Sequence, residues 1–411
     1  MKKISDTFCI LPWVHVASRP DGTPRLCCYT RSNTIRKDNN ISYKLGDDSI
    51  EEIWNSNYMK DVRLKMINGE KVHDCAKCYK MEELGGSSNR LLCNKFEMID
   101  DIDNIIEYTK KHNGETTTKP TFFDLRLGNL CNLKCRMCSP INSSQIQKEF
   151  SNINDFDHIF NPPVDSNTNT WFLDEKFWND LEKYIPYIHH LYFTGGEPTI
   201  IEQHYVFLEG MIERGFTDIL LRYNTNLTNV QPRFLNILKN FKNVRLSCSL
   251  DGYGKINDYI RSPSKWEIVS QNFETYINEV PHVSVSIAST VQAMNVLYLD
   301  DLYNWLYDIN TKYNESLHVN MSLMSNPRRL TVDVLTPKLK QMALDRLNKM
   351  DTTFVYKPDR LEAVKKKLKE PEPDDIIELR NQFKYYTKTL DKVRNENLLE
   401  VAPELSDIYK D

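Results

Sequence analysis

Hydrophobic positions from residue 121 onward follow two alternating patterns. Short apolar runs, rich in β-branched and aromatic residues and ending in Gly, Asn, Asp or Ser, are typical of strands. Longer amphipathic stretches with helical spacing lie between them, as at 203–215, where Gly215 marks a helix end, and at 299–313. The six predicted strands are 121–128, 190–196, 218–226, 243–252, 282–290 and 317–324.

Regular strand–helix alternation predicts parallel strands joined by right-handed crossovers. Six such units over residues 120–330 indicate an α/β fold, either a partial (β/α)6 TIM-type barrel or an open doubly wound sheet. In both architectures the polar site lies at the carboxyl ends of the strands. We expect the partial barrel.

The flanking segments have different patterns. Residues 1–110 predict a small domain of cysteine-bearing loops around one amphipathic helix at 48–67, which Asp47 to Ser49 can cap. The polar stretch 101–120 is typical of a linker. Residues 331–411 are charged with helical spacing and predict a helical C-terminal extension.

Composition adds few constraints. A hydrophobic content of 40%, a charged content of 27% and a net charge of −4 are ordinary for a globular protein, so neither nucleic acid nor a membrane is expected as a partner. The apolar run near the N-terminus is broken by Pro12, His15 and Arg19, which argues against a signal peptide. We expect a cytoplasmic protein.

The chain has ten cysteines. In a reducing compartment, clustered cysteines bind metal or perform redox chemistry more often than they form disulfides. The positions favour two groups of metal ligands, one before residue 94 and one at 131–138.

The second group, Cys131, Cys135 and Cys138 in "CNLKCRMC", follows the first predicted strand. Zinc sites and fully ligated iron–sulfur cubes use four ligands, and no His follows within a dozen residues. Either a distant side chain completes a zinc site, or one coordination position is open, as in sites that perform chemistry.

Three further motifs lie at predicted strand ends: "GGEP" at 195–198, "NTN" at 224–226 and "SLDG" at 249–252. Together with "CNLKCRMC", they resemble the radical S-adenosylmethionine (SAM) superfamily over about residues 120–325. The resemblance implies that three thiolates hold a [4Fe–4S] cluster whose fourth iron binds SAM. It further implies reductive cleavage of SAM to a 5′-deoxyadenosyl radical, which abstracts hydrogen from a substrate.

The resemblance also implies the residues that bind SAM. Gly195 and Gly196 would let the backbone approach the methionine ammonium, Glu197 would supply opposite charge, and Arg261 would pair with the carboxylate. Cys248 alternates out of phase with the strand-end residues and is expected in the core. The remaining SAM-binding candidates are Met137, Asn224, Asn226, Ser249 and Asp251.

The N-terminal segment resembles SPASM and twitch domains through a Gly-x4-Cys motif from Gly22 to Cys27, a Trp-bearing helix and a following Cys-x2-Cys pair. The shorter twitch domain fits better, although such domains usually follow the barrel. The resemblance implies a second, auxiliary [4Fe–4S] cluster; zinc is the alternative, Cys28 could replace Cys27, and Cys93 is unassigned. The predicted ligands are Cys9, Cys27, Cys75 and Cys78.

A fully ligated auxiliary cluster could accept an electron from a substrate radical. We therefore expect an oxidoreductase-type reaction, the two-electron oxidation of a small polar, sugar-like substrate, with an external electron donor such as flavodoxin or ferredoxin. Radical modification of a peptide or protein side chain, or of a nucleotide, is the alternative reaction. A non-catalytic iron–sulfur or zinc-binding module is the alternative class.

Overall fold

A computed structural model describes residues 4–30, 34–95, 99, 101–153 and 166–410, with side chains from 170 onward in the last range. The chain divides into two compact units. The first unit comprises residues 1–131, 140–223 and 236–244, and the second comprises 132–139, 224–235 and 245–411. Each unit is described separately below.

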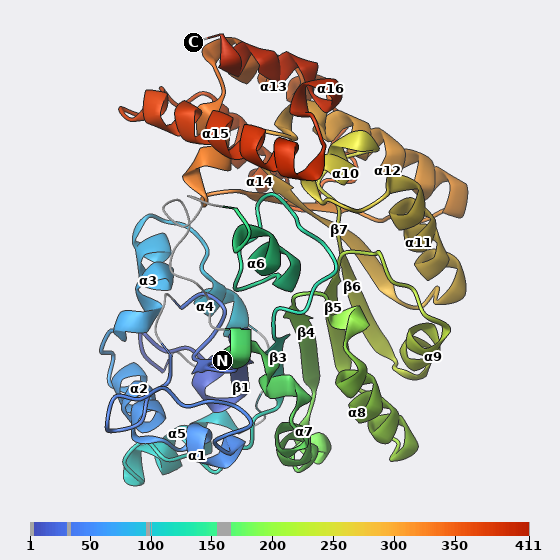
Figure 1. Cartoon of the computed structure of the whole chain (residues 1–411). Helices are drawn as coiled ribbons and strands as arrows, with labels where there is room; N and C mark the ends of the chain where they lie inside the picture. Colours follow the sequence, from blue (N-terminus) through green and yellow to red (C-terminus); the bar gives the residue numbers. More distant parts are fainter. Residues whose placement is uncertain (1–3, 31–33, 96–98, 100, 154–165, 411) are drawn as a thin grey trace. The chain divides into compact units, whose positions relative to one another are not determined.

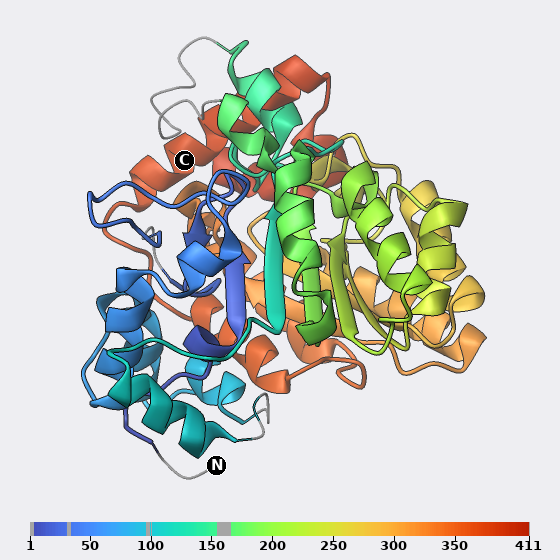
Figure 2. The same cartoon turned by 90° about the horizontal axis from the view of Figure 1, so that it is seen from below.

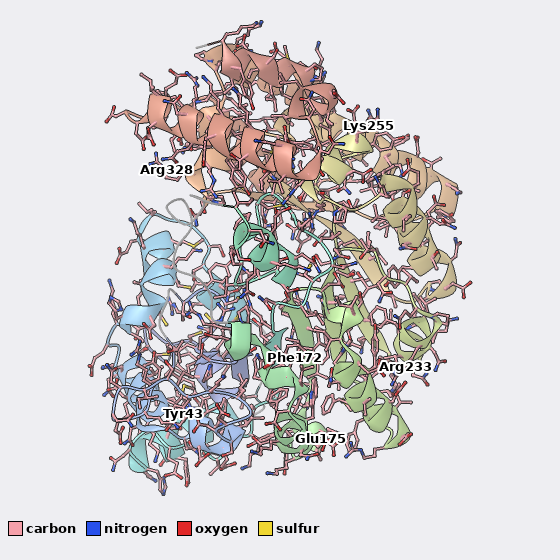
Figure 3. All side chains as sticks on the ribbon, in the orientation of Figure 1. Tyr43, Phe172, Glu175, Arg233, Lys255 and Arg328 are labelled. Atoms are coloured by element: carbon pink, nitrogen blue, oxygen red, sulfur yellow. The ribbon has the colours of Figure 1, made fainter. Side chains whose placement is uncertain are left out.

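The first unit contains a sheet with the strand order β2-β1-β3-β4-β5. Strand β1 pairs antiparallel with β2 and parallel with β3, and β3 and β4 continue the parallel pairing. In Figure 2, β1 and β3 run side by side. The bounds are β1 His15–Ser18, β2 Pro24–Arg25, β3 Phe122–Leu127, β4 His190–Gly195 and β5 Leu220–Thr225.

Strand β1 was not expected, because the N-terminal segment predicted loops around one helix. The strand has only four residues and follows an apolar run that Pro12 interrupts, so its strand signal is weak, and all four of its residues are buried. β1 pairs in parallel with β3, from His15 opposite Phe122 to Ala17 opposite Asp124. The hydrogen bonds of this pairing stabilise a strand whose local strand propensity is low. The cysteine-rich segment therefore contributes a strand to the sheet of the first unit.

The two faces of this sheet differ in chemistry. Side chains alternate along a strand, so Leu191 and Phe193 on β4 point to one face and Tyr192 points to the other. The face of Leu191 and Phe193 is fully buried. Figure 1 shows α7 (Glu175–Glu182) and α8 (Glu202–Glu213) beside these strands. The helix α8 ends at Glu213, and Gly215 follows in a left-handed conformation, as predicted.

The predicted helix at 48–67 is two helices, α1 (Ile50–Trp54) and α2 (Asn57–Ile67). Ser49 caps α1 in a reciprocal capping box with Glu52, which confirms the expected start. Ser56 then caps α2 through its side chain, and this second cap explains the break.

The predicted linker at 101–120 contains a helix, α5 (Ile102–Lys111), so this expectation was wrong. Asp101 caps the helix, and Thr109 accepts a 3.2 Å hydrogen bond from the Trp13 indole. Tertiary contacts thus stabilise a segment whose composition suggested a loop. The other helices of the first unit are α3 Ala76–Glu83, α4 Asn89–Cys93 and α6 Ser144–Phe150.

The second unit contains three consecutive parallel strands, β6 (Asn243–Ser249), β7 (Ser284–Val291) and β8 (Val319–Leu323). Cys248 on β6 is completely buried, which confirms its placement in the core. The helices of this part of the chain are α9 Pro232–Asn240, α10 Lys255–Ile260, α11 Trp266–Glu279, α12 Leu299–Tyr313, α13 Pro337–Lys349, α14 Pro358–Leu368, α15 Ile376–Arg394 and α16 Leu398–Val401.

These elements confirm the predicted α/β class, the six strands after residue 120 and the helical C-terminal extension, in which α13, α15 and α16 form the terminal group (Figure 1). Among the described residues, no helix combines the length and the apolar character needed to cross a bilayer.

Candidate functional site

Four cysteines of the first unit line one cavity. Cys9 precedes a 3-10 turn (Leu11–Trp13), Cys27 follows β2, Cys75 ends a second 3-10 turn (His73–Cys75), and Cys78 lies in the first turn of α3. The structure thus brings together all four predicted N-terminal ligands. The other lining residues are Leu11, Tyr29, Thr30, Asp74, Lys77, Asn89 and Arg90.

Burial governs the protonation of these thiols. Burial, together with the smaller effect of neighbouring cysteines, raises the pKa of Cys27 and of Cys75 to about 12. Burial also raises the pKa of Cys9 well above its ordinary value, with additional increases from Cys75 and Cys27. The four thiols can influence one another because they line the same cavity. The raised pKa values favour the protonated thiols. A cationic metal centre would instead stabilise the thiolates.

The donor set suits a soft metal centre. Four thiolates can hold a [4Fe–4S] cube, in which each thiolate binds a separate iron, or a single tetrahedral zinc ion. Over the described parts of the chain, no three or more His, Cys, Asp or Glu side chains are grouped so as to hold one metal ion. By the type and number of their donors, the four cysteines that line the cavity fit a cube.

Two other thiols lie near this cavity. Cys28 is exposed, and it does not line the cavity. Cys93, at the end of α4, has its pKa raised to about 11 by burial, with further contributions from Cys28 and Cys78. The choice of Cys27 over Cys28 stays a prediction, as does the role of Cys93.

The three-cysteine motif begins in the first unit. Cys131 is buried just beyond β3, and its amide donates a 3.3 Å hydrogen bond to the Ser144 hydroxyl. Ser144 begins α6, and its own amide donates to the Asn129 carbonyl at 2.7 Å. Cys131 thus lies at a carboxyl strand end, as predicted.

The "GGEP" motif of the first unit requires its two glycines. A Cβ at Gly196 would lie 2.0 Å from the Leu130 carbonyl oxygen, and Gly195 has a φ of +121°. The Glu197 amide donates to that same Leu130 carbonyl at 2.8 Å. The motif therefore packs against the segment that leads into Cys131.

Glu197 has a structural contact in addition to its predicted role. Its carboxylate is 1% exposed and accepts hydrogen bonds from the Thr199 amide at 3.1 Å and the Thr199 hydroxyl at 2.7 Å. It thereby caps a short 3-10 turn (Pro198–Ile200). Contact with a methionine ammonium stays a prediction.

Cys135, Met137 and Cys138 belong to the second unit, where the backbone of their loop is tied to the segment after α10. The Lys134 amide donates to the Ser262 carbonyl at 2.6 Å, and the Arg136 amide donates to the Ile260 carbonyl at 2.8 Å. Met137 and Cys138 are half-buried, which leaves both side chains partly accessible.

Arg261 lies at this loop. Its Nη1 is 3.9 Å from Cys135 Sγ, and its Nε is 2.8 Å from Asp251 Oδ2. Burial alone would lower the pKa of Arg261, but Asp251 and Cys135 raise it above its ordinary value, so the guanidinium stays charged. Asp251 also accepts a 2.7 Å hydrogen bond from the Thr290 amide. The structure thus unites three predicted site residues of the second unit.

Three other candidates lie at strand ends in the second unit. Asn226 donates to Asn132 Oδ1 at 2.9 Å and accepts from the Thr228 amide at 3.0 Å, so it shapes the loop after β5. Asn224 and Ser249 are half-buried, at the ends of β5 and β6. Their predicted contacts with SAM hydroxyls stay predictions.

Comparison with protein families accounts for these features. The family model of the Radical SAM superfamily matches residues 125–306, and that of SPASM, an iron–sulfur cluster-binding domain, matches residues 9–79. The chain contains a radical SAM domain preceded by a SPASM domain. The two domains bind a [4Fe–4S] cluster with SAM and an auxiliary iron–sulfur cluster.

Similar solved structures come from proteins of low sequence identity. A structure of anSMEcpe with bound AdoMet and Cp18Cys peptide is 16% identical, with a TM-score of 0.35, over 54% of this chain and 57% of that chain. SuiB of Streptococcus suis bound to S-adenosylmethionine is 16% identical, with a TM-score of 0.36, over 69% and 61%. The chain thus spans about 57% of the first structure's length. No curated protein matches it.

Sequence reasoning missed a residue of the radical SAM loop. Arg136, between two cluster cysteines, is completely buried, and its guanidinium lies 3.6 Å from the Tyr259 ring centroid. Its Nη2 is 2.6 Å from Asp391 Oδ1 and 2.5 Å from Glu396 Oε2. No local signal predicts these contacts, because the acidic partners are more than 250 positions later.

Proposed function

We propose that this chain is a radical SAM enzyme that oxidises a small polar substrate by two electrons, with the auxiliary cluster as electron acceptor. The observation that carries this proposal is the convergence of Cys9, Cys27, Cys75 and Cys78 on one cavity. We further propose that residues 1–110, 120–330 and 331–411 are the three domains, that the protein is cytoplasmic, and that an external donor such as flavodoxin or ferredoxin supplies the electron for SAM cleavage.

In this proposal, Cys131, Cys135 and Cys138 hold the catalytic cluster and leave one iron open for SAM. When bound, this cluster supplies the reducing electron that converts SAM into methionine and a 5′-deoxyadenosyl radical. Arg261 pairs with the methionine carboxylate, since a planar guanidinium suits bidentate contact with a carboxylate. Asp251 holds that guanidinium in place through its 2.8 Å ion pair.

The remaining SAM contacts come from strand ends. Gly195 and Gly196 permit close backbone approach, and Glu197 offers a buried negative charge to the methionine ammonium. Asn224, Asn226 and Ser249 offer hydrogen-bonding groups to hydroxyls, and Met137 provides an apolar contact to the adenine.

Full thiolate ligation of the auxiliary cluster leaves no open iron for substrate, which restricts the N-terminal site to electron transfer. The group that Cys9, Cys27, Cys75 and Cys78 would hold could accept one electron from a substrate that has lost one hydrogen atom, and one proton would go to solvent. The sum is a two-electron oxidation.

Metal analysis tests the proposal. A triple variant, Cys131→Ala/Cys135→Ala/Cys138→Ala, isolates the N-terminal site and should retain about four irons per chain after anaerobic reconstitution. Addition of Cys75→Ala and Cys78→Ala should remove them. Zinc in place of iron in the triple variant would contradict the role as electron acceptor.

A further inference from the structure

A row of charged side chains crosses the sheet of the first unit. Paired Cα positions connect Arg25 to Ala17, Ala17 to Asp124, Asp124 to Tyr192, and Tyr192 to Arg222. Side chains at paired positions point to the same face of a sheet. The row therefore spans β2, β1, β3, β4 and β5, on the face opposite the apolar core.

Several polar atoms in this row have no hydrogen-bond partner among the described residues. They are Nε and Nη2 of Arg25, Oδ1 of Asp124 and Nε of Arg126, which lies two positions beyond Asp124 and so on the same face. Arg25 is 7% exposed and Asp124 is 2% exposed. Buried donors and acceptors without partners are rare in folded proteins, because each costs free energy.

The charge of the row is unbalanced. Three guanidinium groups, from Arg25, Arg126 and Arg222, face one carboxylate, that of Asp124. Arg222 lies 4.7 Å from the centroid of the Tyr192 ring. The excess positive charges on this face repel one another. An added anion would relieve this repulsion.

The row also neighbours the cysteine-rich segment. Arg25 ends β2, two positions before the predicted cluster ligand Cys27, and β2 pairs with β1, which pairs with the β3 strand of Asp124 and Arg126. A substrate group held by the row would thus lie beside the segment that binds the auxiliary cluster, as electron transfer from substrate requires.

We infer that Arg25, Asp124 and Arg126 recognise a substrate oxyanion, a carboxylate or a phosphate, with a hydrogen-bond donor next to it. The guanidinium groups bind the oxyanion through their unpaired N–H donors, and Asp124 accepts from the adjacent amine or hydroxyl. This inference rests on the proposed function, since it specifies the substrate of that enzyme. An oxyanion next to a hydrogen-bond donor is found in amino-acid-like compounds and in phosphorylated polyols, so we expect a substrate of one of these two classes.

Thermal unfolding of the anaerobically reconstituted protein tests the inference with two probes, glycine and inorganic phosphate, each compared with chloride at equal ionic strength. A ligand that binds only the folded state raises Tm, and the rise increases with the logarithm of the ratio of ligand concentration to Kd. We expect at least one probe to raise Tm. In Arg25→Gln/Arg126→Gln, the concentration needed for the same rise should increase at least tenfold.

Three further variants distinguish a carboxylate ligand from a phosphate ligand and provide the controls. Asp124→Asn should weaken the binding of glycine more than the binding of phosphate, because the glycine ammonium needs the Asp124 carboxylate. Arg126→Gln alone repeats the test at a half-buried position if the double variant does not fold. Arg36→Gln, at an exposed arginine of the same unit, should respond like the wild type.

Absence of a Tm rise with both probes, or equal rises in wild type and Arg126→Gln, would overturn the inference. The readout requires no SAM cleavage, so this failure is distinguishable from failure of the proposed function, which the iron count measures.

Discussion

Arg136 Nη2 lies 2.6 Å from Asp391 Oδ1, and this ion pair joins the three-cysteine loop to helix α15 of the C-terminal extension. Asp391 also accepts a 2.7 Å hydrogen bond from the Tyr259 hydroxyl, and the Tyr386 hydroxyl donates to the Arg136 carbonyl at 2.5 Å. The extension therefore helps to position a loop that carries two predicted cluster ligands, Cys135 and Cys138.

The first prediction concerns the ion pairs of Arg136. Asp391→Asn/Glu396→Gln leaves the completely buried Arg136 guanidinium without a charge partner. Removal of the partners of a buried charge costs about 3–5 kcal/mol, so the free energy of unfolding should fall by about that amount. Denaturant unfolding measures the change.

The matched control for this variant is Gln382→Ala, which removes an exposed hydrogen bond to Glu378 on the same helix. Its effect should stay within about 0.5 kcal/mol. Equal effects of the two variants would contradict the anchoring role of Arg136.

The second prediction concerns Glu197. Glu197→Ala removes the charge expected to meet the SAM ammonium, and a charged hydrogen bond contributes about 1.5–3 kcal/mol. SAM affinity, measured by calorimetry on the reconstituted protein, should fall roughly 10- to 100-fold. Thr199→Val removes one hydroxyl donor to Glu197 but keeps the carboxylate, so it should retain most of the affinity. Wild-type affinity in Glu197→Ala would show that the carboxylate only caps the turn.

The third prediction concerns Arg261. Arg261→Lys keeps a positive charge but loses the planar fork that can contact Asp251 and a SAM carboxylate together. SAM affinity should fall about tenfold, equivalent to one lost hydrogen bond to a charged group. Arg245→Lys, at an exposed position on β6, provides the comparison and should bind SAM normally. If both variants bind SAM alike, Arg261 does not contact the cofactor.

The fourth prediction distinguishes two adjacent thiols. Cys27 lines the N-terminal cavity together with Cys9, Cys75 and Cys78. In the triple variant that lacks the radical SAM cysteines, Cys27→Ala should therefore lower the iron content, whereas Cys28→Ala should leave about four irons. The reverse pattern would make Cys28 the ligand.

Sequence patterns predicted the parts of this protein whose determinants are local. The six strands after residue 120 are short apolar segments separated by helices. Cys131 and the two glycines before Glu197 lie at strand ends, where parallel folds place polar sites. Ser49 was an identifiable helix cap for the same reason, because its capping box with Glu52 spans four residues.

The features that were missed depend on contacts between distant residues. Strand β1 forms because β3 pairs with it, and α5 contributes Thr109 to the Trp13 side chain. Arg136 is completely buried with Asp391 as its partner, 255 positions later in the chain. Such tertiary contacts have no sequence period, so pattern analysis cannot detect them.

The most direct test of the account is the amount of 5′-deoxyadenosine formed from SAM by the anaerobically reconstituted, chemically reduced protein. Wild type should form it, and so should Cys248→Ala, which changes a buried cysteine outside both ligand sets. The triple variant, Cys131→Ala/Cys135→Ala/Cys138→Ala, should form none while it keeps its N-terminal irons. Formation of 5′-deoxyadenosine by the triple variant at the wild-type rate would contradict the central claim that these three cysteines hold the cluster that cleaves SAM.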